Sequence, residues 1–171
     1  EALRDCEYAT LATVNADGTP YCIPISPVLV DGIIYFHCAL EGNKLDNIGH
    51  NNNVCVSGVR HTRLVPEKFT TEFESAVAFG CCTVVKDDGE KIMALRMICE
   101  KYEAENISAF DDAIRRSLLR TGVCRMEISS ITGQATKYPH SMAVLSVAKC
   151  FPSNMRRAPR DLAALYPLCA A

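Results

Sequence analysis

The feature that most constrains this chain is the stretch from Tyr35 to Asn47, which reads YFHCALEGNKLDN. Its first half belongs to an apolar run, Ile33–Ala39, that is rich in residues favouring β-strands. Gly42 follows, and glycine adopts backbone angles that tight turns need and other residues resist. Lys44 and Asn47 are three positions apart, so a helix would place both on one face. The stretch therefore predicts the end of a buried strand, a short turn and the first turn of a helix.

Such an arrangement can bind phosphate. A helix N-terminus presents unpaired N–H groups and a partial positive charge, and Lys44 would add a cation beside them. His37 would lead into the same place from the strand. Two interpretations remain open on this local pattern: a phosphate cradle, or an ordinary strand-turn-helix with a solvated lysine and a histidine held in the core.

The bulk composition narrows the possible classes of protein. A chain of 171 residues suggests one domain, and 49% hydrophobic residues predict a sizeable core. The net charge of −2 does not favour nucleic acid as a partner, and no apolar run is long enough to span a bilayer. The first residue is Glu1, so we expect a few residues to precede it, and a cleaved signal sequence stays open.

The ten cysteines point to free thiols. None form a C-x-x-C pair, which weakens zinc and thioredoxin-type interpretations, and His50, His61 and His140 lack partners at metal-ligand spacing. We therefore predict no metal site. Four of the cysteines lie in apolar strand-like runs, where a free thiol behaves as a small buried hydrophobe: Cys22, Cys38, Cys55 and Cys124. Cys81 and Cys82 are adjacent and should point to opposite faces of a strand. Free thiols predict a cytoplasmic location.

The first forty residues predict a meander of antiparallel strands. An Asn15–Gly18 turn and an Asp31-Gly32 hairpin separate the runs. Pro24 and Pro27 interrupt the middle strand and mark an edge, a bulge or the approach of a ligand, because proline lacks the N–H of a central strand. The three predicted strands are Tyr8–Val14, Tyr21–Val30 and Ile33–Ala39.

The rest of the chain predicts further strands and two helices. Gly80 should mark a bulge in the strand that contains it. Ile92, Leu95, Ile98, Cys99 and Tyr102 recur at helical spacing, and Ile114, Leu118 and Leu119 should face inward on the next helix. The expected elements are a helix to about His50, a strand Val54–Val59, a loop His61–Lys68, a strand Phe69–Lys86, helices Glu90–Glu105 and Ser108–Arg120, and a strand Val123–Ile128 whose end is set by Thr132-Gly133.

Three segments of the chain carry distinctive motifs: Asp17–Ile25, Ile34–Lys44 and Ile128–Thr136. Together they resemble the FMN-binding split-barrel family of pyridoxamine 5′-phosphate oxidase-like proteins, in its nitroimidazole-resistance (Nim) branch. The segment Asp17–Ile25 is similar to the family's DG-x-P-x-x-x-P strand. The segment Ile34–Lys44 is similar to its iYFH-x-A-x-x-G-x-K signature, and Ile128–Thr136 is similar to its closing strand. The resemblance implies a mainly β fold: an antiparallel split barrel with peripheral helices, in a domain of residues 1–138.

The resemblance also implies a set of site residues. Lys44 would bind the FMN phosphate with the help of Gly42 and Asn47, and Ala39 belongs to the same signature. His37 would lie beside the flavin on the substrate side, as the catalytic candidate. Further cofactor contacts would come from two strands: Pro24, Ile25 and Ser26 at the edge of the ring, and Thr10, Leu11 and Ala12 beneath it.

The chain departs from the family pattern in two places. Gln134 stands where the closing motif usually has a lysine. Residues 139–171 match nothing in the family, and we treat them as a C-terminal extension of uncertain order.

The resemblance implies an FMN-dependent oxidoreductase that acts on a small molecule. It would accept electrons from NAD(P)H and reduce a nitro-aromatic or quinone-like compound. No arginine-rich patch is placed for a second phosphate, which disfavours vitamin B6 phosphate oxidation. The rival is a split barrel that holds flavin or haem without turnover. The resemblance further implies a homodimer, and the apolar stretch Phe69–Val85 agrees with one. The alternative is a monomer in which Met142–Ala148 covers the same surface.

Overall fold

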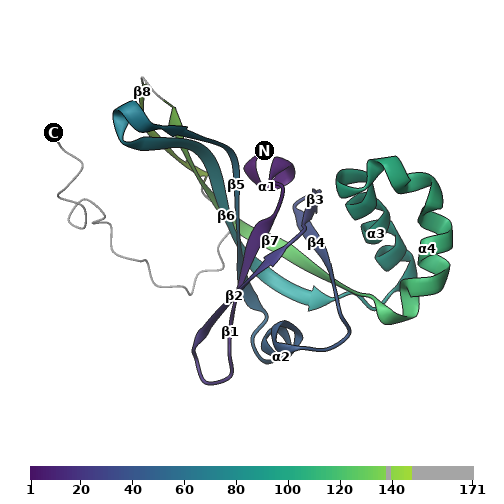
Figure 1. Ribbon diagram of the computed structural model, residues 1–171. Helices are drawn as coiled ribbons and strands as arrows, with labels where there is room; N and C mark the ends of the chain where they lie inside the picture. Colours follow the sequence, from purple (N-terminus) through teal and green to yellow (C-terminus); the bar gives the residue numbers. More distant parts are fainter. Residues whose placement is uncertain (138–139, 148–171) are drawn as a thin grey trace.

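The computed structural model describes residues 1–137 and 140–147. Seven strands form one antiparallel sheet in the order β2-β1-β5-β6-β7-β4-β3, and β8 pairs with the outer part of β7 (Figure 1). The strands are β1 Ala9–Val14, β2 Pro20–Ile25, β3 Val28–Val30, β4 Ile33–Cys38, β5 Asn53–Val65, β6 Thr70–Val84, β7 Gly122–Lys137 and β8 His140–Val147. The sheet curls without closing, so the predicted split barrel is confirmed.

The prediction of a three-stranded meander is wrong. β1 pairs with β2 and β3 pairs with β4, but β2 and β3 lie at opposite edges of the sheet. The predicted strand Tyr21–Val30 is therefore two strands, separated by Ser26 and Pro27. Because these two residues join opposite edges, the edges must approach each other at that point. Pro24 and Pro27 mark an edge strand and its end, as a missing N–H requires.

The long hairpin of β5 and β6 projects from the sheet past β1, β2 and β4, with β8 and the outer part of β7 beside it (Figure 1). We expected a loop at His61–Lys68, but β5 continues to Val65 and only Pro66–Lys68 forms a 3-10 turn, η1. A register shift between Arg60 and Arg63 absorbs the irregular sequence, with His61 at a positive φ of 54°. The polar sequence of this segment is typical of a loop. Much of this arm is exposed to solvent, however, so its strands need no alternation of apolar residues.

The predicted bulge at Gly80 is confirmed by a register shift between Phe79 and Gly80. A Cβ at Gly80 would lie 1.9 Å from the carbonyl oxygen of Glu127, so only glycine fits there. The expected end of the last strand at Thr132-Gly133 is wrong, since β7 runs on to Lys137. Thr132-Gly133 resembles a turn when the sequence is considered alone, but pairing with β6 keeps this segment extended.

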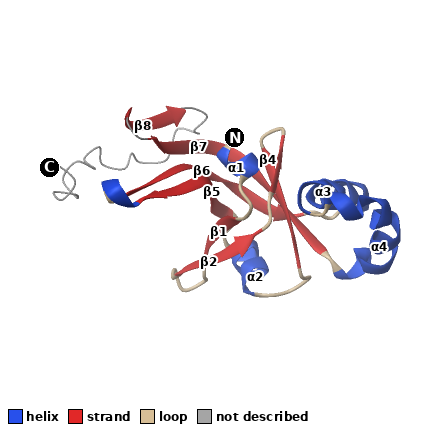
Figure 2. Ribbon diagram, turned by 45° about the horizontal axis from the view of Figure 1, so that its top comes forward, coloured by secondary structure: helices blue, strands red, loops and turns tan. Residues whose placement is uncertain are grey.

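The helices lie outside the sheet: α1 Ala2–Asp5, α2 Asn43–His50, α3 Asp88–Tyr102 and α4 Phe110–Ser117, with 3-10 turns η2 Ala104–Ala109 and η3 Leu118–Arg120. The α3–α4 pair lies at the end of the sheet away from the hairpin tip (Figure 2). Asp87 caps α3 by accepting a hydrogen bond from the amide of Glu90. The expected inward face holds for Ile114 and Leu118 but not for Leu119, which is 89% exposed because the chain changes to a 3-10 turn there.

Two hydrophobic clusters hold the fold together. The first fills the barrel and includes Leu11, Phe36, Val56 and Met126. The second lies between the other face of β4 and the helices, and includes Tyr35, Leu95 and Phe110. Thus β4 is buried on both faces, which explains its nearly continuous apolar run.

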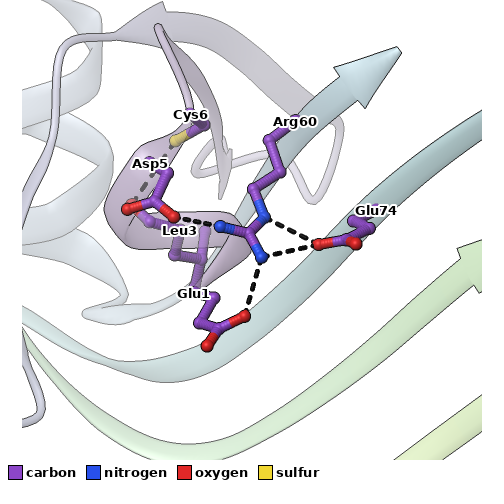
Figure 3. Close-up of polar contacts among 6 residues, drawn as sticks. All are labelled: Glu1, Leu3, Asp5, Cys6, Arg60 and Glu74. Atoms are coloured by element: carbon purple, nitrogen blue, oxygen red, sulfur yellow. Dashed lines mark hydrogen bonds and ion pairs between the residues drawn. The ribbon is translucent and has the colours of Figure 1, made fainter. Parts of the chain in front are cut away.

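The short helix α1 is fixed to the sheet by one arginine (Figure 3). The guanidinium of Arg60 pairs with the carboxylates of Glu1, Asp5 and Glu74. Close packing beneath the helix depends on Gly58, where a Cβ would meet the side chain of Leu3 at 2.9 Å. These contacts hold α1 against β5 and β6.

The eight cysteines in the described residues are free. Cys38 and Cys124 are buried as predicted, and Cys81 and Cys82 lie on opposite faces. Cys22 is exposed, contrary to the prediction, because it lies on the outer face of an edge strand, and Cys55 is half-buried. None of the helices in the described part of the chain is both long and apolar enough to cross a membrane.

The structure also describes part of the C-terminal extension. β8 pairs with residues 131–137 of β7, whereas β4 pairs with residues 122–127. β4 and β8 therefore pair with opposite ends of β7. Residue 138 of the predicted domain and residues 139 and 148–171 of the extension lie outside the described residues, including Ala148 of the segment Met142–Ala148.

Candidate functional site

The strand-turn-helix predicted from the sequence is present. β4 ends at Cys38, and α2 begins at Asn43 with Gly42 as its N-cap. Gly42 has a φ of 124°, which a residue with a side chain rarely adopts. Glycine is therefore needed at this position to turn the chain from the sheet into the helix.

A cavity of about 400 Å³ opens where the two edges of the sheet converge, and we call it the site pocket. Its walls come from β2 and the residue after it, from β4 and the residue after it, from the residue before β1, and from α2. The lining residues are Tyr8, Pro24, Ile25, Ser26, His37, Cys38, Ala39 and Lys44. The pocket thus brings together six of the predicted residues from three separate segments.

Lys44 is the cation of the site pocket. Its side chain is half-buried, and it makes no hydrogen bond or ion pair within residues 1–137 and the described β8 backbone. The amides of Asn43 and Lys44, the first two of α2, likewise have no carbonyl partner in that part of the chain. A cation beside two unpaired amides at a helix N-terminus is a donor set suited to an anion such as phosphate.

His37 lines the same pocket and is exposed. Although solvent reaches the ring, the partial burial of the imidazole lowers the pKa of His37 below its ordinary value, and the charge of Lys44 lowers it further. His37 is therefore neutral at pH 7, and a neutral imidazole can both donate and accept a hydrogen bond.

The other predicted contacts do not line the site pocket. Leu11 is fully buried in the barrel core, while Thr10 and Ala12 point to the opposite face of β1. Asn47 is also buried and donates to Thr13 Oγ1 at 3.0 Å and Asn15 Oδ1 at 2.8 Å. Its amide therefore ties α2 to the β1–β2 hairpin, and Gly42 acts through the turn. Direct cofactor contacts by these residues stay predictions.

Sequence reasoning missed two lining residues and one supporting residue. Tyr8 is 62% exposed and reaches the pocket because β1 pairs with β2 beside Ser26. Cys38 forms part of the wall, with its Sγ 3.9 Å from that of Cys124, and the neighbouring thiol and burial both raise the pKa of Cys38. A Cβ at Gly122 would come within 2.9 Å of Cys38 Sγ, so glycine makes room for this wall.

A larger cavity of about 550 Å³ lies at the base of the hairpin arm. It is lined by Arg60 and Arg63, but these pair with Glu74 and Glu72. Because both arginines pair with carboxylates, the described lining of this cavity offers no unpartnered cation like Lys44. We therefore place the functional site at the smaller pocket.

The profile of the pyridoxamine 5′-phosphate oxidase family matches residues 1–135. The chain belongs to this family. The match covers most of the chain and includes every residue of the site pocket. The family membership predicted from the three motifs is therefore confirmed.

Three solved structures have a fold similar to that of this chain. A candidate 5-nitroimidazole antibiotic resistance protein from Bacteroides thetaiotaomicron is 26% identical, with a TM-score of 0.63 over 75% of this chain and 76% of that one. The FAD and heme binding protein from Mycobacterium smegmatis is 18% identical, with a TM-score of 0.68 over 98% and 88%. The flavocytochrome Anf3 from Azotobacter vinelandii is 15% identical, with a TM-score of 0.61 over 96% and 83%. The last two identities support the fold alone. A comparison with proteins of curated function found no match.

Proposed function

We propose that this family member binds FMN in the site pocket and passes electrons from NAD(P)H to a small planar acceptor, such as a nitro-aromatic or quinone-like compound. The observation that carries the proposal is Lys44, a half-buried cation without a partner in the described chain. It lies beside unpaired helix amides and lines the same pocket as His37. The name of the Bacteroides relative supports a nitro-aromatic acceptor.

In this proposal, different residues bind the phosphate, the flavin ring and the acceptor. Lys44 and the first amides of α2 hold the phosphate, through charge-assisted hydrogen bonds. Pro24, Ile25 and Ser26 offer backbone groups to the ring, because an edge strand leaves half of its polar groups unpaired. Bound FMN supplies the two-electron chemistry. Neutral His37 donates or accepts a hydrogen bond toward the acceptor.

A second copy of the chain completes the pocket in this proposal. The sheet face turned away from the barrel core carries no charged residue in two rows across five strands, and we call it the neutral face. The rows are Pro24–Thr10–Ser57–Val77–Thr132 and Cys22–Ala12–Cys55–Phe79–Ser130. Phe79, on β6, is 46% exposed on this face, and uncharged patches with exposed aromatics mark interfaces. Pro24 belongs to both the neutral face and the site pocket, so a partner on this face would reach the cofactor.

The rival function is a protein that holds a cofactor without turnover. The names of two solved relatives include flavin and haem together, which favours testing both cofactors. The free thiols support a reducing compartment such as the cytoplasm for either function.

The absorbance spectrum of the purified protein separates these functions. We expect a flavin spectrum that NADH or NADPH bleaches without oxygen, and that a nitro-aromatic or quinone then restores. His37→Ala should slow that restoration while FMN remains bound. A Soret band in place of the flavin spectrum, or flavin that no nicotinamide reduces, would support the binding protein instead.

A further inference from the structure

The wall of the site pocket depends on the connection between two sheet edges. β2 ends at Ile25 and β3 begins at Val28, so Ser26 and Pro27 alone connect the two edge strands of the sheet. Ser26 lines the site pocket, and the next residue, Pro27, is fully buried. The position of Pro27 therefore determines how closely the Ser26 wall approaches His37.

Two side chains of α3 hold Pro27. Its carbonyl oxygen accepts a hydrogen bond from Lys101 Nζ at 2.8 Å and another from the hydroxyl of Tyr102 at 3.0 Å. Proline has no N–H, so this carbonyl is the only backbone group through which Pro27 can be anchored. Both lone pairs of the oxygen are directed at one helix end.

Partial burial of its charge makes Lys101 an energetically unfavourable choice for a residue that only anchors Pro27. Its side chain is half-buried and forms no ion pair among the described residues, and burial lowers its pKa. Its Nζ lies 4.8 Å from the centre of the Tyr102 ring. A half-buried ammonium loses part of its hydration, and contacts with one carbonyl and one ring replace that hydration only in part. At the other end of α3, Lys91 Nζ donates to the carbonyl of Leu118 at 2.6 Å, which anchors the helix without touching the pocket connection.

We propose that Lys101 and Tyr102 are positioning residues for the cofactor: by holding the Pro27 carbonyl, they set the place of the Ser26 wall and so the seat of the flavin ring. The inference rests on the proposed function for its ligand. It assigns a role in the site to α3, which contributes no residue to the pocket itself.

The test compares Lys101→Met and Tyr102→Phe with Lys91→Met as the matched control from the same helix. Each variant is measured for the free energy of unfolding, for FMN affinity, for the visible circular dichroism of bound FMN, and for amide hydrogen exchange at Ser26 and Val28 without FMN. Lys101→Met and Tyr102→Phe should exchange faster at Ser26 and Val28. They should also bind FMN about 3- to 10-fold more weakly, as the loss of one net hydrogen bond implies, and alter the flavin dichroism. Lys91→Met should change only stability.

The outcomes separate this inference from the function on which it rests. If wild-type protein binds no flavin, the proposed function fails, and the exchange rates still test whether α3 holds Pro27. Unchanged exchange at Ser26 and Val28 in both α3-end variants would overturn the inference. So would faster exchange with unaltered FMN affinity and dichroism, since the connection would then be held without effect on the seat of the ring.

Discussion

At the scale of single residues, the site depends on two neighbours with opposite preferences for charge. Lys44 must stay protonated to bind a phosphate, and its charge disfavours a proton on His37. An imidazole whose pKa is lowered stays neutral at pH 7 and becomes charged only as the pH falls through that lowered value. Activity that needs neutral His37 should therefore persist to lower pH than an ordinary histidine would allow.

Removing the charge of Lys44 tests this coupling without any cofactor. In Lys44→Gln the pKa of His37 should rise toward its ordinary value, while the burial effect, the larger of the two, remains. The measurement is an NMR titration of the His37 ring protons in the apo protein, with Lys86→Gln as an exposed control. An unchanged or lower His37 pKa in Lys44→Gln would show that the charge of Lys44 does not lower the pKa of His37. In an active enzyme, the acid limb of the pH profile should move to higher pH in the same variant.

The residues that sequence reasoning could find are those whose signal is local. Gly42 and Lys44 follow a strand at short spacing, so their placement at the helix start needs no knowledge of distant segments. Tyr8 could not be found in this way, because its place in the pocket depends on pairing between β1 and β2. Asn47 was on the expected helix, but its amide partners come from the distant β1–β2 hairpin.

At the scale of elements, the same division between local and distant signals holds. The turn at Asn15–Gly18 and the hairpin at Asp31-Gly32 were predicted, since each depends on four residues or fewer. The order of the strands was not, because it depends on which edges meet after the sheet curls. The 3-10 turn at Leu118–Arg120 reversed the expected direction of Leu119 for a similar reason.

The bulge at Gly80 gives a sharp prediction about β6. In Gly80→Ala the new Cβ would lie 1.9 Å from a backbone oxygen of β7, and backbone cannot move aside as a side chain can. We expect the free energy of unfolding to fall by about 1–3 kcal/mol or more, measured by urea denaturation.

Gly49→Ala is the control for that substitution. Nothing lies within 4 Å of a Cβ at this helical position, so alanine should leave stability unchanged or raise it by up to about 1 kcal/mol. Equal effects of the two substitutions would contradict the close approach of β6 and β7.

At the scale of the whole molecule, the neutral face is the surface on which we propose that a second copy of the chain docks. Phe79→Lys would place a charge on this face, and in a two-fold dimer the partner would carry the same charge on the same face. We expect this variant to weaken the dimer by about 2–4 kcal/mol and to elute as a monomer in light scattering at micromolar concentration. Leu119→Lys is the control, because Leu119 is 89% exposed on η3, away from this face. A monomeric wild-type protein that still holds flavin would contradict the dimer.

The central claim is that Lys44 binds the phosphate of a flavin in the site pocket, and the most direct measurement is a comparison of two ligands. FMN and riboflavin differ only in the phosphate, so their Kd values for wild type and Lys44→Ala form a closed cycle. The account predicts that Lys44→Ala weakens FMN binding roughly 10- to 150-fold, as expected for a charge-assisted contact, and leaves riboflavin binding nearly unchanged. Lys86→Ala should alter neither. Equal losses for both ligands, or no loss of FMN affinity, would contradict the account.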